Sequence, residues 1–421
     1  MSEKVLLVGV DWGRKEDWPM EQTLNELKDL VKACQGEPVD SIVCRVARPT
    51  PNFLIGSGKL KEIIDLCQSQ KVDTVIFSHD LKGSQQRNLE EALQRKTVDR
   101  TQLILDIFAR RAKSREGKMQ VELAQLQYLL PRLVGKGIEL SRPGGGIGTL
   151  GPGETKLETD RRRISARITR LKQDLKDLSL ERQIKRKKRK ENALPTVALV
   201  GYTSAGKSTL LNRLTQSDQP TRAGLFTTLD PIARQCLLPN QQRAIISDTV
   251  GFMHELPHHL IEAFHATLEE VQEADLLLLV LDVSHPNFRS RHEAVGDVLR
   301  ELDCRDKLRI TVLNKIDCLP DKEGLLALEA NFDPAVAISG LTGENVTGLL
   351  EKMTGLLFRG LLRVELKIPL ERMDLMNLIH RQGQVHSLKY FSRWVRVVAS
   401  VSPEIAGRLR AYAIGPSEIQ R

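Results

Sequence analysis

The residues with the clearest chemical potential are the eight of GYTSAGKS, at positions 201–208. They fit the pattern GxxxxGK[ST] and stand between an apolar, strand-like run and the helix-compatible sequence STLLNRL. Such glycines let backbone N–H groups wrap a pyrophosphate near the positive end of the following helix. Lys207 would bridge the β and γ phosphates, and Ser208 would bind Mg²⁺. The pattern therefore predicts a phosphate-binding loop.

Two further motifs follow strand-like runs and indicate which nucleotide the site binds. DTVG at 248–251 places Asp248 where it would reach the Mg²⁺ shell through water, and Gly251 where its N–H could sense a γ phosphate. NKID at 314–317 is more informative, because the carboxylate of Asp317 can accept both N1–H and the exocyclic amine of guanine. Adenine cannot offer that pair of donors, so the motif predicts GTP rather than ATP.

Two loops complete the predicted nucleotide site. LFTTLDP, at 225–231, could supply the Mg²⁺-binding threonine of a first switch, and we favour Thr228 over Thr227. The segment 339–341 ends a further strand and could present a backbone N–H to the guanine carbonyl. The predicted Mg²⁺ ligands are Ser208, Thr228 and Asp248. The predicted nucleotide-binding residues are Gly201, Tyr202, Thr203, Ser204, Ala205, Gly206, Lys207, Ser208, Thr209, Phe226, Thr227, Thr228, Asp248, Thr249, Val250, Gly251, Asn314, Lys315, Asp317, Ser339, Gly340 and Leu341.

The position after DTVG, where many GTPases carry a glutamine that orients the attacking water, is Phe252. An apolar side chain cannot polarise water, so intrinsic hydrolysis should be slow unless another group or a partner positions the water. Nothing in the sequence identifies that group, and the catalytic residue is left unassigned.

The charge of the 421-residue chain is concentrated in one place. With 63 Lys and Arg against 54 Asp and Glu the net charge is +9, and residues 156–192 alone hold 15 basic and 6 acidic residues. A basic run is often only a solvated linker. Here the whole excess lies beside a glycine-rich segment, which favours a phosphate backbone as partner. Aromatic residues, at 4%, argue against a stacking platform for single strands as the main activity. The candidate RNA contacts are Arg142, Lys156, Arg161, Arg162, Arg163, Lys185, Arg186, Lys187, Lys188, Arg189 and Lys190.

Leucine and isoleucine repeats predict two packed helices. Met119, Leu123 and Leu126 begin a repeat that reaches residue 133, and Ile164 and Ile168 begin another that reaches residue 178. The stretch 142–154, with six Gly and two Pro, cannot continue either helix. We expect a long antiparallel hairpin with helices of about 24 residues, or roughly 36 Å. Pro131 should kink or interrupt the first helix. A two-helix element folded back on a neighbouring domain is the alternative.

The rest of the chain has the sequence pattern of α/β structure. Strands alternate with helices in residues 1–114, nearly continuous apolar strands of a parallel sheet recur in 193–357, and 358–421 is a small α/β module of unassigned chemistry. The predicted organisation is an N-terminal α/β domain (1–114), a helical hairpin (115–192), a P-loop GTPase domain (193–357) and the C-terminal module (358–421). Six scattered cysteines suggest neither disulfides nor a metal site, and no apolar run could span a bilayer. We expect a soluble, cytoplasmic monomer.

The order of motifs resembles the HflX family of translational GTPases over essentially the whole chain. The resemblance rests on GGIGTLGPGETKLETDRRRI (145–164), GYTSAGKST, LFTTLDP, DTVGF and NKID, after the segment 99–133. It implies GTP hydrolysis stimulated by the large (50S) ribosomal subunit, with the hairpin against ribosomal RNA. It also implies ribosome association and a role in splitting or rescuing stalled ribosomes under stress.

Two positions depart from that family. Ser204 stands where members usually have an asparagine that can bind an assisting potassium ion, so potassium stimulation is not expected. Ser339-Gly340 replaces the usual Ser-Ala and keeps the backbone N–H. Two other functions fit the same sequence: an RNA-binding ribosome assembly or sequestration factor that uses GTP only as a slow switch, and a GTPase in tRNA modification.

Overall fold

The computed structural model describes residues 2–13, 18–133, 156–191, 194–217, 225–226, 232–254 and 265–414. These residues form two compact units. The first contains the chain up to Ser179 with the short stretches 225–226 and 265–267, and the second contains the other described residues from Leu180 onward. The division falls within one helix, and the four predicted domain limits stay predictions. None of the helices in the described ranges is both long and apolar enough to cross a membrane.

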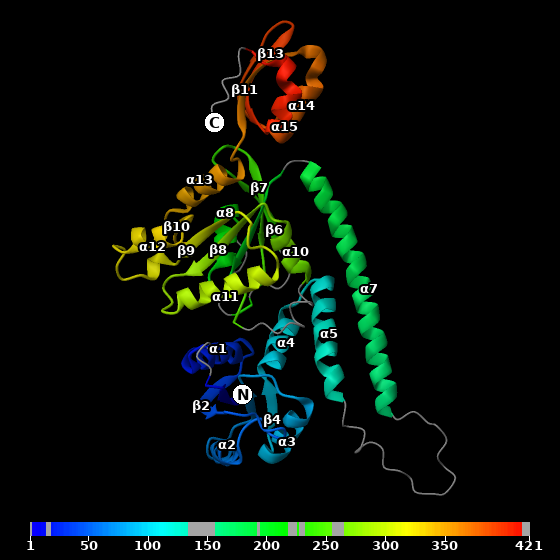
Figure 1. Ribbon diagram of the computed structural model, residues 1–421, viewed down its shortest axis with the longest axis vertical. Coiled ribbons are helices and arrows are strands. Elements are labelled where there is room, and N and C mark those ends of the chain that lie inside the picture. Colours follow the sequence, from blue (N-terminus) through cyan, green and yellow to red (C-terminus); the bar gives the residue numbers. More distant parts are fainter. Residues whose placement is uncertain are drawn as a thin grey trace, which may run out of the picture. The chain divides into compact units, whose positions relative to one another are not determined.

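The first unit is built on a four-stranded parallel sheet of order β2-β1-β3-β4 (Figure 1). Strands β1 and β3 are almost wholly buried, as expected for a parallel sheet covered by helices. The elements are β1 (Lys4–Asp11), α1 (Met20–Ala33), β2 (Glu37–Arg45), α2 (Ser57–Ser69), β3 (Thr74–Phe77), α3 (Gly83–Leu93), β4 (Lys96–Asp99), α4 (Arg100–Arg111), α5 (Arg115–Leu129) and the 3₁₀ turn η1 (Leu130–Leu133). The sequence-based prediction of an N-terminal α/β region is confirmed.

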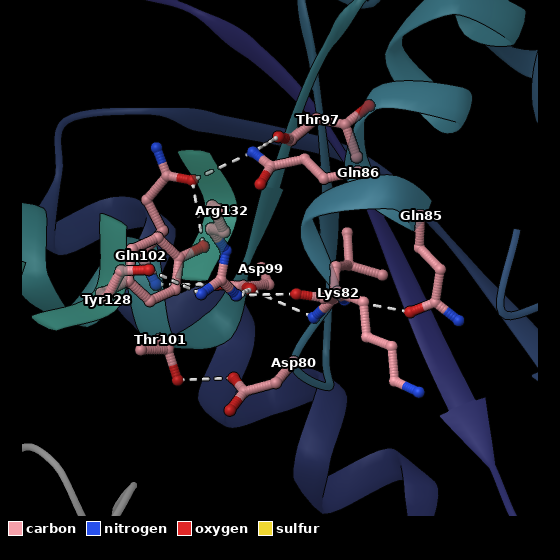
Figure 2. Close-up of polar contacts among 11 residues, drawn as sticks. Asp80, Lys82, Gln85, Gln86, Thr97, Asp99, Thr101, Gln102, Tyr128 and Arg132 are labelled. Carbon is pink, nitrogen blue, oxygen red and sulfur yellow. Dashed lines mark hydrogen bonds and ion pairs between the residues drawn. The ribbon is translucent and has the colours of Figure 1, made fainter. Parts of the chain in front are cut away.

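One buried ion pair fixes the end of the α5–η1 segment to this sheet (Figure 2). The guanidinium of Arg132 lies 2.9 Å from Asp99 Oδ2 and donates to the carbonyls of Leu81 and Tyr128 at 2.7 and 2.9 Å. It also stacks 3.4 Å over the Tyr128 ring. Asp99 is fully buried at the end of β4 and caps α4 by accepting from the Gln102 N–H. Burial raises the pKa of Asp99, and the backbone N–H groups of Gln102 and Leu81, followed by the Arg132 guanidinium, oppose that rise.

Replacing Arg132 by methionine should destabilise the first unit by about 3–5 kcal/mol, because it leaves the buried Asp99 carboxylate without its cation. Hydrogen exchange of the β4 amides measures this loss. Arg115→Met, at the exposed start of α5, is the matched control and should leave the exchange rate unchanged. A loss below about 1 kcal/mol for Arg132→Met, the range of an exposed pair, would contradict this account of the anchor.

The predicted hairpin is present with unequal arms. The first α-helix has only 15 residues and ends at Leu129, where a 3₁₀ turn that contains Pro131 follows, as the proline predicted. The second, α7 (Lys156–Glu191), has 36 residues, about 54 Å, and both therefore differ from the expected 24. The two run side by side, joined by both guanidinium nitrogens of Arg167 on Glu122 at 2.7 and 2.8 Å (Figure 1). Leu171 of the predicted repeat is fully buried.

The second unit contains a six-stranded sheet of order β10-β9-β8-β5-β7-β6. Its elements are β5 (Thr196–Gly201), α8 (Lys207–Thr215), β6 (Ile232–Leu237), β7 (Arg243–Asp248), α10 (His265–Glu273), β8 (Leu276–Asp282), α11 (Phe288–Glu301), β9 (Arg309–Asn314), η2 (Ile316–Cys318), α12 (Leu325–Asn331), β10 (Ala335–Ala337) and α13 (Val346–Leu357). Five strands are parallel, as the apolar runs predicted. The sixth, β6, is antiparallel to β7 at the edge. Sequence reasoning missed β6 because its IARQCL sequence is not continuously apolar, and only one of its six residues is buried.

The C-terminal part of the second unit has its own antiparallel sheet of order β11-β13-β12. The elements are β11 (Leu362–Pro369), η3 (Leu370–Arg372), α14 (Met373–Gln382), β12 (Gln384–Tyr390), β13 (Trp394–Val401), α15 (Pro403–Leu409) and η4 (Arg410–Tyr412). Helices α14 and α15 cover one face of this sheet and share a core with it (Figure 1). The small α/β module predicted from the sequence is confirmed for the described part of this region.

Candidate functional site

The loop between β5 and α8 has the close packing that a phosphate loop needs. At Gly201 a Cβ would collide with the carbonyl of Val280 on β8, so only glycine fits. Gly206 has φ +94° and no room for a Cβ beside the Asn314 amide. Both glycines are therefore required by the backbone path, and the loop delivers its N–H groups to the start of α8.

Lys207 and Ser208, the first residues of α8, lie where phosphate and Mg²⁺ chemistry would need them. The Lys207 ammonium is buried and donates to the carbonyls of Gly201 and Tyr202, each at 3.0 Å. Burial lowers its pKa to about 8, with Asp248 acting in the opposite direction. Phosphate oxygens at this point would supply negative charge that stabilises the protonated form and opposes the lowering of the pKa.

The DTVG segment lies directly against the phosphate loop. Ser208 Oγ donates to Asp248 Oδ2 at 2.6 Å, so two of the predicted Mg²⁺ ligands already lie together. A hydroxyl and a carboxylate oxygen are the hard donors that Mg²⁺ prefers, and the pair fits that ion. Gly251 lies so close to Lys207 and the loop that a Cβ would lie 3.1 Å from the Lys207 Nζ.

Phe252 has a structural role, and its side chain takes no part in the chemistry. Its side chain is buried, its N–H donates to the Gly201 carbonyl at 3.0 Å, and its carbonyl accepts from the Thr203 N–H at 2.8 Å. These bonds tie the end of the DTVG segment to the phosphate loop. A buried phenyl ring cannot orient a water molecule, which agrees with the expectation from the sequence.

The NKID segment combines a structural brace with an exposed carboxylate. The Asn314 side chain donates to the Ala205 carbonyl at 2.8 Å and accepts from the Gly340 N–H at 2.9 Å, so it joins the phosphate loop to segment 339–341. Asp317 is exposed, and a hydrogen bond from Ser339 holds its pKa below the usual range. An ionised acceptor therefore faces solvent at the end of the loop, as guanine recognition requires.

Two details of this region did not follow from the sequence. Lys315 adopts φ +68° and places its ammonium 2.6 Å from Asp282, at the end of β8, so Asp282 supports the motif from outside it. In segment 339–341 the Ser339 and Gly340 N–H groups already donate to Glu344 and Asn314. The contact of this segment with the guanine carbonyl stays a prediction.

The first-switch segment is described only at Leu225 and Phe226. Phe226 was predicted to line the nucleotide, but its ring is buried edge-to-face on Phe108 of α4, with centroids 4.6 Å apart. The sequence LFTTLDP gave no sign of this packing partner, more than 100 positions away. Thr227 and Thr228, the candidate Mg²⁺ threonines, lie outside the described residues.

Comparison with known proteins agrees with this geometry. Three family models match: "GTP-binding GTPase N-terminal" at 21–109, "GTP-binding GTPase Middle Region" at 111–189 and "50S ribosome-binding GTPase" at 196–315. A GTPase HflX from Caldanaerobacter subterraneus is 46% identical over 413 residues, which is 98% of this chain and 94% of the relative. The chain belongs to the HflX family of GTPases. The GTPase HflX of Escherichia coli is 37% identical over 96% of this chain and 93% of its own.

The resemblance to the HflX family, the fold class and the assignment as a GTPase are thereby confirmed. Among solved structures, a GTP-binding protein from Sulfolobus solfataricus in complex with GDP is 24% identical. It covers 84% of this chain and 98% of its own chain, with a TM-score of 0.45.

The candidate RNA contacts of this HflX-family chain are only partly described. Residues 161–163 at the start of α7 carry three exposed arginines, and Arg163 lies 3.8 Å from Asp160 of the same helix. Residues 185–190 are helical, but their side chains, like that of Lys156, lie outside the description. Arg142 and the glycine-rich segment 142–154 are also outside it. The assignment of RNA contacts to this helix stays a prediction.

Proposed function

We propose that this protein is a Mg²⁺-dependent GTPase that binds the large ribosomal subunit through ribosomal RNA and acts on stalled ribosomes. The observation that carries the nucleotide part is the shared packing of the phosphate loop, Asp248 and Asn314 around one site. Lys207 would hold the β and γ phosphates, and Ser208 and Asp248 would hold Mg²⁺, with Thr228 as a third ligand. The ion would neutralise charge that develops on the phosphates during transfer.

The ribosomal part of the proposal rests on the family match and on charge. The model matched at 196–315 is described as a 50S ribosome-binding GTPase. The long basic helix α7 has the charge density that an RNA backbone would attract, and its exposed arginines support such a contact. Phe252 fits a partner-dependent reaction, because the chain lacks the usual glutamine for positioning water.

Co-sedimentation tests this partner. The GTP-bound protein should sediment with purified 50S particles, and excess tRNA should not displace it. If the protein bound tRNA instead and did not sediment with 50S particles, the tRNA-modification reading would replace this one. A Lys207→Ala variant that retained full cellular activity would favour the assembly or sequestration factor, in which nucleotide is only a slow switch.

Exchanging potassium for sodium should change the rate of GTP hydrolysis by less than about twofold. Ser204 adopts φ +62° in the loop and is exposed, and its short hydroxyl replaces the longer amide that would reach an ion beside the phosphates. Ser204→Asn should introduce potassium stimulation, measured as phosphate release in the two salts at equal ionic strength. Strong potassium stimulation of the unchanged protein would contradict the role given to this position.

A further inference from the structure

The antiparallel sheet of residues 358–414 has one face that helices do not cover. Along β13 the residues alternate, with Val395, Val397, Ala399 and Val401 buried under α14 and α15. The residues between them therefore lie on the opposite face of the sheet. Trp394 and Arg396 belong to that face, and Arg396 is exposed in the whole chain. The face is a solvent-facing surface of the protein.

Three cations lie in register across this face. Arg396 of the central strand pairs directly with Lys367 of β11 on one side and with Lys389 of β12 on the other. All three side chains are exposed. Like charges placed directly opposite one another destabilise a sheet. Glu365 pairs with Arg396, whereas among the described residues neither lysine has an ion-pair partner. Two of the three cations therefore have no compensation among the described residues, and the row suits an external polyanion.

Aromatic rings adjoin the same cations. The chain has only 3 Trp, 4 Tyr and 10 Phe, yet one of each lies within residues 390–394, at the turn between β12 and β13. Phe391 stacks on Trp394 with centroids 4.0 Å apart and an interplanar angle of 14°. The Lys367 ammonium lies 4.7 Å from the Trp394 ring. Phe391 is 44% exposed, so a flat apolar ring is presented to solvent beside positive charge. Tyr390 is 66% exposed, but it pairs with Val395 and therefore belongs to the opposite side of the sheet.

We propose that this surface binds an unpaired segment of RNA. We call it the C-terminal platform, and it comprises Lys367, Lys389, Phe391, Trp394 and Arg396. Bases would stack on the exposed rings while the row of cations contacts the phosphates, the combination by which single strands are bound without strict sequence preference. An acidic peptide would use the cations but gain little from stacked rings, which favours RNA. Residues 358–421 also carry eleven Lys and Arg against five Asp and Glu.

This inference goes beyond the proposed function, which places RNA binding on the hairpin, and it does not rest on the ribosome being the partner. A module of otherwise unassigned chemistry would give the protein a second RNA contact, one that reads exposed bases rather than backbone charge alone. The composition argued against stacking as the main activity, and the structure shows a local concentration that an average of 4% conceals.

Fluorescence anisotropy with a labelled 12-nucleotide RNA of non-pairing sequence tests the platform. The parent is the full chain with residues 185–190 changed to glutamine, so that electrostatic binding to α7 does not mask the platform. Phe391→Leu should weaken binding about tenfold, and Phe391→Trp should retain it. Lys389→Gln should lower the slope of log K against log salt by about 0.7. Arg408→Gln, which removes one exposed charge from the helical side of the same module, should leave RNA affinity unchanged.

Melting temperature and GTP affinity, measured on every variant, show that each remains folded. Three results would overturn the proposal. The first is that the folded Phe391→Leu and Lys389→Gln variants bind the RNA as tightly as their parent. The second is that Arg408→Gln loses as much RNA affinity as Lys389→Gln. The third is that polyglutamate of equal charge displaces the labelled RNA as well as unlabelled RNA does, which would assign the face to an acidic protein segment.

Discussion

Replacing Asp317 by asparagine should change the preferred base of this GTPase from guanine to xanthine. The carboxylate of Asp317 is ionised and exposed beside Ser339, and two charge-assisted hydrogen bonds from guanine would end on it. An asparagine offers one acceptor and one donor, which match N1–H and the 2-carbonyl of xanthine. With guanine, the asparagine NH₂ would instead face the exocyclic amine, so one hydrogen bond is lost and two donors point at each other. This should weaken the binding of GTP by about 3 kcal/mol or more, at least about a hundredfold in affinity.

Competition between labelled GTP and xanthosine triphosphate measures the exchange directly. Asp321→Asn, an exposed aspartate four positions further on, is the matched control and should keep the guanine preference. Asn314→Ala should weaken both nucleotides together, since Asn314 braces the loop rather than reading the base. Unchanged guanine preference in Asp317→Asn would refute the assignment of NKID.

Changing all six basic residues at 185–190 to glutamine should weaken binding to the large ribosomal subunit and flatten its salt dependence. Each phosphate contact that is lost should lower the slope of log K against log salt by about 0.7–0.9. Glutamine has nearly the helix propensity of lysine and arginine, so α7 should persist. Sedimentation with 50S particles at several salt concentrations gives the slope. All-arginine replacement keeps the charge and is the control.

Nucleotide affinity should not change in that glutamine variant. The residues of the nucleotide site lie on the phosphate loop, the DTVG segment and the ends of β9 and β10, and none is part of α7. A fall in GTP affinity with unchanged 50S binding would mean that the positive charge serves the nucleotide site instead.

Periodicity and local motifs account for most of what the sequence predicted. The apolar strands and the GxxxxGKS, DxxG and NKxD signatures are local patterns with a strict spacing, and the structure brings Ser208, Asp248 and Asn314 together as those patterns require. Pro131 predicted the end of the first hairpin helix because it removes a backbone donor.

Contacts between distant positions were not predictable in this way. Arg132 contacts Asp99 across 33 positions, and Phe226 packs on Phe108 across more than 100, with no periodic signal for either. The net charge of the chain also concealed a second basic region. Residues outside 156–192 sum to zero, yet 358–421 are clearly basic, so a positive module and an acidic remainder cancel in the total.

The central claim is that hydrolysis of GTP depends on the large ribosomal subunit. Its most direct test is GTP turnover at saturating Mg²⁺, with purified 50S particles, with 30S particles and without ribosomes. Because Phe252 is buried and cannot position water, a partner that completes the site should accelerate turnover on the order of a hundredfold. We predict that acceleration with 50S particles and little change with 30S particles. Equal rates in all three reactions would contradict the account.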